Sequence, residues 1–157
     1  MEKLNKKHEQ LMLALTTLQD AISLLEDFEK QTDSAEYCNS AFFKSPQQFR
    51  RTLRDSVIQR FEYCADSFWK FFKDYLEDQS IILDIKSPKA TMRALCQARI
   101  LNEQQTELAI TMFESRNTTS HAYKEEVAEL VWESTPQFYK FMMEIMDRIN
   151  IKQEKKS

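Results

Sequence analysis

The chain contains no glycine among its 157 residues, and only three prolines. Glycine is the residue that most readily takes a positive φ, which tight hairpin turns and phosphate-binding loops require. Most β-hairpins would therefore lack their usual turn residue here. A standard Walker loop and a dinucleotide-binding GxGxxG fingerprint are excluded, because both are built on glycines. The chain is consequently not an ordinary P-loop kinase or a dinucleotide-dependent enzyme.

Apolar residues recur along the chain in alternating steps of three and four, the spacing of one face of a helix. This pattern predicts long helices over roughly residues 2–30 and 46–78 and a last helix that ends at Ile149. The second of these helices is unusually aromatic. Beside its first apolar stripe it carries another, which needs a neighbour: either a further helix or a second chain. That extra stripe consists of Trp69, Phe72 and Leu76.

Two serine–proline pairs, Ser45–Pro46 and Ser87–Pro88, mark helix starts, because serine caps a helix and proline suits its first position. The second pair opens a short helix to about residue 100, and Asn102 caps another over roughly 103–115. Residues 81–85 are apolar but too few for a helix, so we expect them to pack as a crossing link. The predicted fold class is all-α, an up-and-down helical bundle of the four-helix type with an additional short helix.

We expect residues 1–150 to form one domain and the charged residues 151–157 to form a disordered tail. The net charge of −3 attracts no nucleic acid as a whole, so any RNA contact has to be local, for example at Arg50 and Arg51 with Arg54. The three cysteines show neither zinc-site nor disulfide spacing. No signal peptide or long apolar segment occurs. We therefore expect a cytoplasmic protein with no membrane segment, metal or other cofactor.

Residues 116–123, RNTTSHAY, combine three side chains suited to work on a phosphodiester or a nucleotide. Arg116 is a permanent cation with a planar fork of donors. His121 can act as a general acid or base near neutral pH. Tyr123 adds a hydroxyl that can donate, accept or be modified. Their other neighbours are small and polar, which favours a site over a packed core.

This segment resembles the motif of the HEPN superfamily, in which an arginine and a polar residue precede a histidine and then a tyrosine. More narrowly, the chain resembles the HEPN proteins encoded beside minimal nucleotidyltransferases, known as nucleotidyltransferase substrate-binding proteins or as toxins. Residues 54–63, RDSVIQRFEY, resemble the second helix of that family, and Ser87–Pro88 with the alanine-rich segment after it resembles the start of the third. The resemblance covers roughly residues 1–149.

The resemblance implies a function as well as a fold. It implies the toxin of a toxin–antitoxin pair, a metal-independent endoribonuclease in which His121 is the general base or acid at a ribose 2′-hydroxyl and Arg116 holds the phosphate. It implies that a cognate minimal nucleotidyltransferase transfers AMP to Tyr123 and so silences the toxin. A homodimer, with the two motifs facing one cleft that takes RNA or a nucleotide, is implied too.

Each of these residues also has a plainer interpretation. Arg116 could complement the dipole at a helix C-terminus, and His121 could be a surface or capping residue. Asn117 could orient Arg116 or bind a phosphate, and it could equally cap the helix C-terminus. Ser120 could support the site or serve as the N-cap of the last helix. We expect that helix to begin at about Ser120 or Lys124. Tyr123 could pack against the bundle with its hydroxyl in water.

A second function stays open beside the ribonuclease. The chain could be a non-catalytic accessory subunit that binds a nucleotidyltransferase and helps to present its substrate. The presence of arginine, histidine and tyrosine together favours the ribonuclease, since an accessory subunit needs no such set. The net negative charge is a mild argument against a general RNA-binding surface.

Overall fold

The computed structural model describes residues 1–31 and 43–149, and within these ranges it contains helices and no strand. The all-α prediction is confirmed, whereas the expected tail at 151–157 lies outside the described residues. The elements are α1 (Glu2–Lys30), α2 (Pro46–Asp78), α3 (Pro88–Gln97), α4 (Glu103–Thr118), the 3₁₀ turn η1 (Thr119–His121) and α5 (Glu125–Arg148).

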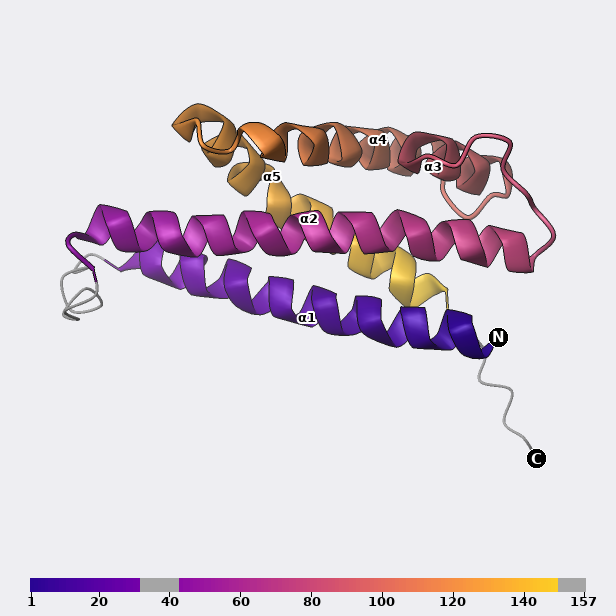
Figure 1. The fold of residues 1–157 in the computed structure, drawn as a ribbon, viewed down its shortest axis with the longest axis horizontal. Helices are drawn as coiled ribbons and strands as arrows, with labels where there is room; N and C mark the ends of the chain where they lie inside the picture. The colour runs from indigo at the N-terminus through magenta and orange to yellow at the C-terminus, as the bar shows by residue number, and fades with distance from the viewer. Residues whose placement is uncertain (32–42, 150–157) are drawn as a thin grey trace.

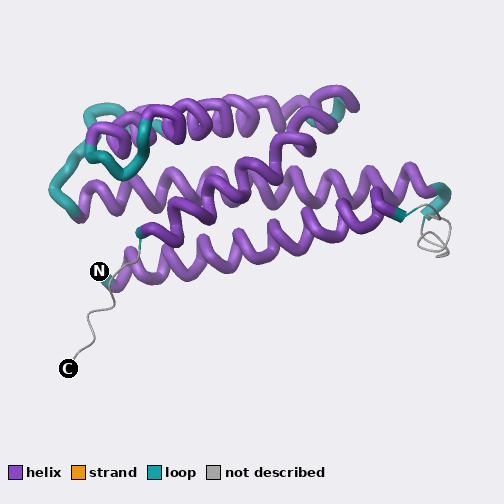
Figure 2. Tube along the Cα trace, turned by 180° about the vertical axis from the view of Figure 1, so that it is seen from behind, coloured by secondary structure: helices purple, strands orange, loops and turns teal. Residues whose placement is uncertain are grey.

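The two longest helices, α1 and α2, lie side by side and run in opposite directions (Figure 1). The helices α3 and α4 lie along the other flank of α2. The last helix crosses behind the α1–α2 pair, as the reverse view shows (Figure 2). This crossing places the start of α5, together with η1, beside the first half of α2 and the end of α4. The candidate site lies at that junction.

Local capping explains where three of the helices start. The hydroxyl of Ser45 accepts a hydrogen bond from the Gln48 backbone N–H at 3.1 Å, and the hydroxyl of Ser87 accepts from Ala90 at 3.2 Å. Asn102 and Gln105 form a reciprocal capping box at the start of α4. Each cap satisfies a backbone N–H that has no partner within the helix. The helix starts predicted from the two serine–proline pairs and from Asn102 are therefore confirmed.

One continuous apolar core accounts for both stripes of α2. Phe68 and Phe71 are buried, and so are Phe72 and Leu76 of the extra stripe, while Trp69 is partly buried against the same core. The helices α3, α4 and α5 all pack on α2. Of the two alternatives for the extra stripe, a further helix is therefore the one observed. The stripe gives no separate reason for a dimer.

Two helices end in left-handed residues although the chain has no glycine. Ser80 after α2 has φ 64° and Arg99 after α3 has φ 59°. In both cases the following backbone N–H, from Ile81 or Ile100, bonds back to the carbonyl of the helix five residues earlier, at 2.8 and 2.9 Å. These are Schellman motifs, in which glycine is the usual left-handed residue. Each non-glycine side chain here bears a steric cost of about 1–2 kcal/mol.

The predicted crossing link over residues 81–85 is wrong. Ile82 is 76% exposed and Ile85 is 70% exposed, and only Leu83 packs partly on the core. The Schellman turn at Ser80 is the physical reason, because it directs the chain away from the bundle before α3 begins. Among the described residues, no helix has both the length and the apolarity needed to cross a bilayer.

Candidate functional site

The Arg116 guanidinium is held by acidic side chains of α2. Its Nε and Nη2 donate to the two carboxylate oxygens of Asp66 at 3.0 and 2.9 Å. Its Nη1 donates to the Thr119 hydroxyl at 3.0 Å and lies 3.5 Å from a carboxylate oxygen of Glu62. Glu62 and Asp66 are four residues apart and so face the same side of α2. The last turn of α4 is thus fastened to α2.

These contacts raise the pKa of Arg116, chiefly through the hydrogen bond with Asp66. The fork that would hold a phosphate is therefore already engaged by carboxylate. Because the Arg116 side chain keeps about a quarter of its surface exposed, an incoming anion can still reach it. Arg116 also lies in the last turn of α4, where its charge complements the helix dipole, so the plainer interpretation of this residue holds as well.

Thr119 ends α4 and sets the path toward the histidine. Its buried hydroxyl donates to the Arg116 carbonyl at 2.7 Å and accepts from the Arg116 side chain. One 3₁₀ turn follows, closed by a hydrogen bond from the Ala122 N–H to the Thr119 carbonyl at 3.1 Å. His121 ends this turn and is exposed, with its ring centroid 6.1 Å from that of Tyr123. Tyr123 is 77% exposed, so its hydroxyl is open to a modifying enzyme.

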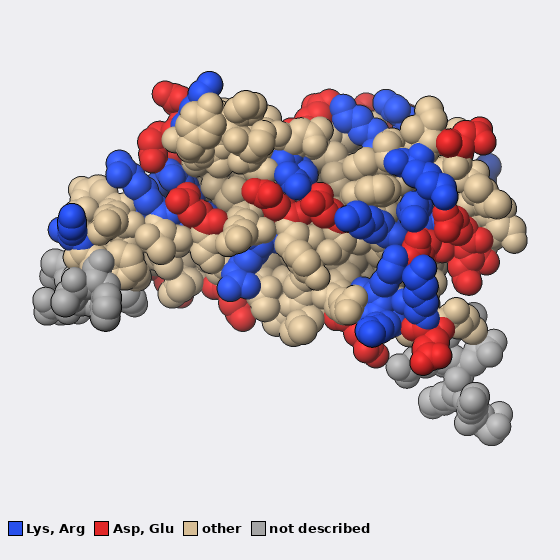
Figure 3. All heavy atoms as spheres, in the orientation of Figure 1, with Lys and Arg blue, Asp and Glu red and all other residues tan. Residues whose placement is uncertain are grey.

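A hollow lies beside the C-terminal end of the motif. This hollow, about 390 Å³ in volume, lies between α2 and the segment after η1, and both Glu62 and Tyr123 line it. Within the described residues, no hydrogen bond, ion pair or ring contact joins His121 directly to Arg116. Acidic and basic side chains are interspersed along the middle of α2 in the space-filling view (Figure 3). The site is accordingly mixed in charge, and no uniformly basic surface surrounds it.

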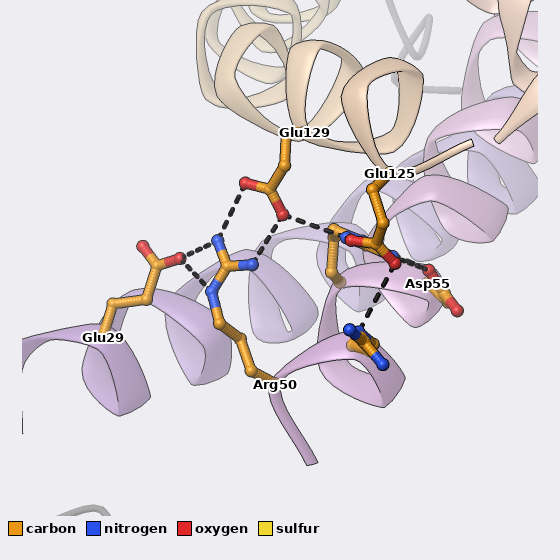
Figure 4. A network of polar contacts seen from close by, with 7 residues as sticks. Glu29, Arg50, Asp55, Glu125 and Glu129 are labelled. Carbon is orange, nitrogen blue, oxygen red and sulfur yellow. Dashed lines mark hydrogen bonds and ion pairs between the residues drawn. The ribbon is translucent and has the colours of Figure 1, made fainter. Parts of the chain in front are cut away.

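A second ion-pair network anchors the helix that follows the motif. Arg54, 2% exposed, donates to Glu125 at 2.7 Å and to Glu129 at 3.0 Å. Arg50 joins Glu129, at 2.6 and 2.9 Å, to Glu29 of α1. Figure 4 shows the two α5 glutamates directed toward α2, with Glu29 reaching in from α1. Because Glu125 is two residues after Tyr123, this network fixes the position of the motif's C-terminal end.

The network engages Arg50, Arg51 and Arg54, the three arginines at which the sequence suggested a local RNA contact. Arg54 is buried and paired, Arg50 is held between two glutamates, and Arg51 lies 3.4 Å from Glu125. The physical reason is that α5 covers this face of α2 with carboxylates. Hydrogen bonds from Arg50 and then from Arg54 lower the pKa of Glu129 to about 2. The network is therefore fully charged at neutral pH.

The two supporting residues predicted from the sequence lie close to the motif but make few contacts. Asn117 is exposed within α4, and Thr119, not Asn117, caps that helix. Ser120 lies inside η1, where its hydroxyl contacts the Asn117 carbonyl at 3.3 Å, and Lys124 takes the N-cap position of α5. Both capping interpretations are therefore wrong. The 3₁₀ turn is the cause, because it continues α4 past Asn117 and delays α5.

Sequence reasoning missed the groups that hold Arg116. Asp66 and Glu62 lie at least fifty positions before it in the chain, on another helix. The only local signal was their spacing of four residues, which many surface carboxylate pairs share. Thr119 was inside the motif but looked like one more small polar residue.

The described parts of the chain show no metal site, and the Cys64 thiol is unreactive. No group of three or more His, Cys, Asp or Glu side chains there is arranged to hold a metal ion. Burial raises the pKa of the Cys64 thiol to about 12, so this cysteine is protonated at neutral pH and is not a nucleophile.

Solved structures share this fold. A protein from Thermus thermophilus is 27% identical, with a TM-score of 0.59 over 83% of this chain and 97% of its own. A tri-AMPylated HEPN toxin from Shewanella oneidensis, in complex with an MNT antitoxin, is 15% identical, with a TM-score of 0.64 over 92% and 93%. A toxin–antitoxin structure with AMP-PNP is 17% identical, with a TM-score of 0.59 over 89% and 97%.

A search of curated protein sequences found no significant match. The family model described as "Nucleotidyltransferase substrate binding protein like" does match, and it spans residues 13–151. That range contains α2, the Arg116–Tyr123 segment and the whole of α5. The chain therefore belongs to the family of nucleotidyltransferase substrate-binding-like proteins.

Proposed function

We propose that this chain is a HEPN toxin, a metal-independent endoribonuclease that works as a homodimer and is paired with a minimal nucleotidyltransferase antitoxin. The observation that carries the proposal is the junction of α2, α4 and η1, where Arg116, held by Asp66, is followed five residues later by an exposed His121, next to an open hollow that Glu62 and Tyr123 line. The toxin–antitoxin setting is supported by the fold shared with the AMPylated toxin from Shewanella oneidensis.

The chemistry follows from these groups. His121 of one protomer takes the proton of a ribose 2′-hydroxyl, and the 2′-oxygen attacks the adjacent phosphorus. The bond from phosphorus to the 5′-oxygen breaks, that oxygen receives a proton from the second histidine of the dimer, and a 2′,3′-cyclic phosphate remains. Arg116 balances the charge that develops on the phosphate oxygens. No metal is needed, because the nucleophile is the RNA's own hydroxyl.

Regulation by AMP transfer to Tyr123 completes the proposal. An added AMP would fill part of the hollow that Tyr123 lines and would bring a phosphate toward Arg116. The added AMP would then inhibit cleavage in two ways, by blocking the hollow and by pairing with Arg116 in place of RNA. The partner nucleotidyltransferase can reach this hydroxyl, since the side chain is 77% exposed.

A non-catalytic, substrate-binding subunit remains a second candidate, favoured by the carboxylates of Glu62 and Asp66 that already occupy Arg116. Cleavage of total RNA in a chelator separates the two functions. The ribonuclease predicts 2′,3′-cyclic phosphate ends that disappear in Arg116→Ala and His121→Ala but persist in Arg93→Ala, an exposed arginine of α3. Failure of the unaltered protein to cleave RNA or to arrest growth would favour the accessory subunit.

A further inference from the structure

Within the described residues, only one arginine of α2 is free of carboxylates. Arg50, Arg51 and Arg54 are all paired with glutamates of α1 or α5. Arg60, in contrast, is exposed and makes no ion pair with any carboxylate in the described ranges, and its Nε lies 3.4 Å from the Ser56 hydroxyl. A cation held in place but left without a counter-ion is available to a ligand.

Arg60 borders a groove of about 480 Å³ between α1 and α2. Two exposed apolar side chains form part of its walls: Leu13 of α1, 67% exposed, and Tyr63 of α2, 58% exposed. Gln10 and Gln59 add amides that can both donate and accept hydrogen bonds. The ring can stack on a nucleotide base, the amides can bond the edges of that base, and the unpaired cation can bind its phosphate.

The groove adjoins the candidate site across the outer face of α2. Gln59 lines both the groove and the hollow that Tyr123 and Glu62 border. A helix with its side chains is about 10 Å across, so a strand bound at Arg116 reaches the groove by crossing a single helix. The ridge at Gln59 therefore links the two hollows without any rearrangement of the fold.

We propose that this groove binds a nucleotide of single-stranded RNA next to the cleaved bond, with its base on Tyr63 and its phosphate on Arg60. The inference rests on the proposed ribonuclease function, which it deepens by assigning the path of the substrate. Aromatic rings are common stacking surfaces for unpaired bases. A nucleic-acid strand suits the groove because it brings a phosphate to Arg60, which has no carboxylate partner in the described ranges.

Binding of fluorescent, 2′-O-methylated single-stranded RNA by the full-length protein tests the groove without requiring cleavage. Tyr63→Ala should weaken binding about tenfold, whereas Tyr63→Phe, which keeps the ring, should bind normally. Arg60→Gln should also weaken binding and should reduce the slope of log affinity against log salt by about 0.7, the value for one phosphate of a single strand. Arg93→Gln makes the same change of charge on α3 and is the matched control.

The outcomes separate this inference from the proposed function. If the native protein cleaves RNA, and Arg60→Gln and Tyr63→Ala leave the KM for RNA unchanged, the groove is rejected and the ribonuclease is retained. RNA binding that depends on both residues, without any cleavage, would reject the ribonuclease and retain the groove. No binding by the native protein, equal losses in Arg60→Gln and Arg93→Gln, or a dimer that dissociates in Tyr63→Ala would each overturn the groove as an RNA site.

Discussion

Arg116 and Asp66 face each other through a two-point contact, with both carboxylate oxygens accepting from the guanidinium at 2.9–3.0 Å. Such paired geometry fixes the plane of the arginine as well as its position. The guanidinium at the last turn of α4 is thereby held in a fixed orientation against α2. Glu62 makes a looser contact, at 3.5 Å, with the remaining terminal nitrogen.

This difference predicts opposite effects for two isosteric substitutions. Asp66→Asn removes one acceptor and releases the fork, so RNA cleavage should fall about 100-fold, mainly in kcat. Glu62→Gln removes a carboxylate that competes with phosphate, so KM should fall severalfold with little change in kcat. Steady-state cleavage of a short RNA measures both. Faster cleavage by Asp66→Asn would mean that this carboxylate blocks Arg116 and does not position it.

The left-handed Arg99 predicts that a glycine would stabilise the protein. Its positive φ costs about 1–2 kcal/mol, while glycine adds about 0.5–1 kcal/mol of unfolded-chain entropy. Arg99→Gly should therefore raise the free energy of unfolding by up to about 1.5 kcal/mol. Urea denaturation can measure this change. Arg93→Gly, in the middle of α3, is the control and should lower the same free energy by about 1 kcal/mol.

The fold followed from the sequence because its signals are local. A serine–proline pair or a capping asparagine determines where a helix starts without reference to the rest of the chain. The apolar spacing then identifies the buried face. Such signals do not say which other helix packs against that buried face. Arg54 looked like part of a basic surface patch because nothing in α2 reveals that Glu125 and Glu129 lie across it.

The site was predictable only in part, for the same reason. Arg116, His121 and Tyr123 lie within eight residues, so their spacing carried a family resemblance. The partners of Arg116 come from α2. Contacts between residues so far apart in the sequence depend on how α4 packs on α2. The 3₁₀ turn, which shifted both caps, arises from the Thr119 hydroxyl bonding to the carbonyl and the side chain of one arginine. No single-residue propensity predicts that double contact.

The charge network predicts how stability depends on acid. Arg50 and Arg54 lower the pKa of Glu129 from its ordinary value of about 4.5 to about 2. A carboxylate with a lowered folded-state pKa contributes stability above its unfolded pKa, and that contribution is lost as pH falls through the folded value. The melting temperature should therefore drop between about pH 4.5 and pH 2 by more in the native protein than in Glu129→Gln. Glu133→Gln, an exposed change one turn further along α5, should keep the native pH profile; identical profiles for all three proteins would contradict this role for Glu129.

Modification of Tyr123 is the prediction with the sharpest internal control. Two tyrosines are well exposed in the described residues, Tyr123 at 77% and Tyr63 at 58%. They line neighbouring hollows that share Gln59, so Tyr63→Phe is the matched control for Tyr123→Phe. Of the two, Tyr123 is the tyrosine whose ring lies 6.1 Å from that of His121. Co-expression with the cognate nucleotidyltransferase should therefore add the mass of one or more AMP groups to the native chain and to Tyr63→Phe, and none to Tyr123→Phe. The toxicity of Tyr123→Phe should no longer be relieved by the partner. Full neutralisation of the native chain with an unshifted mass would instead show that the partner inhibits by covering the hollow.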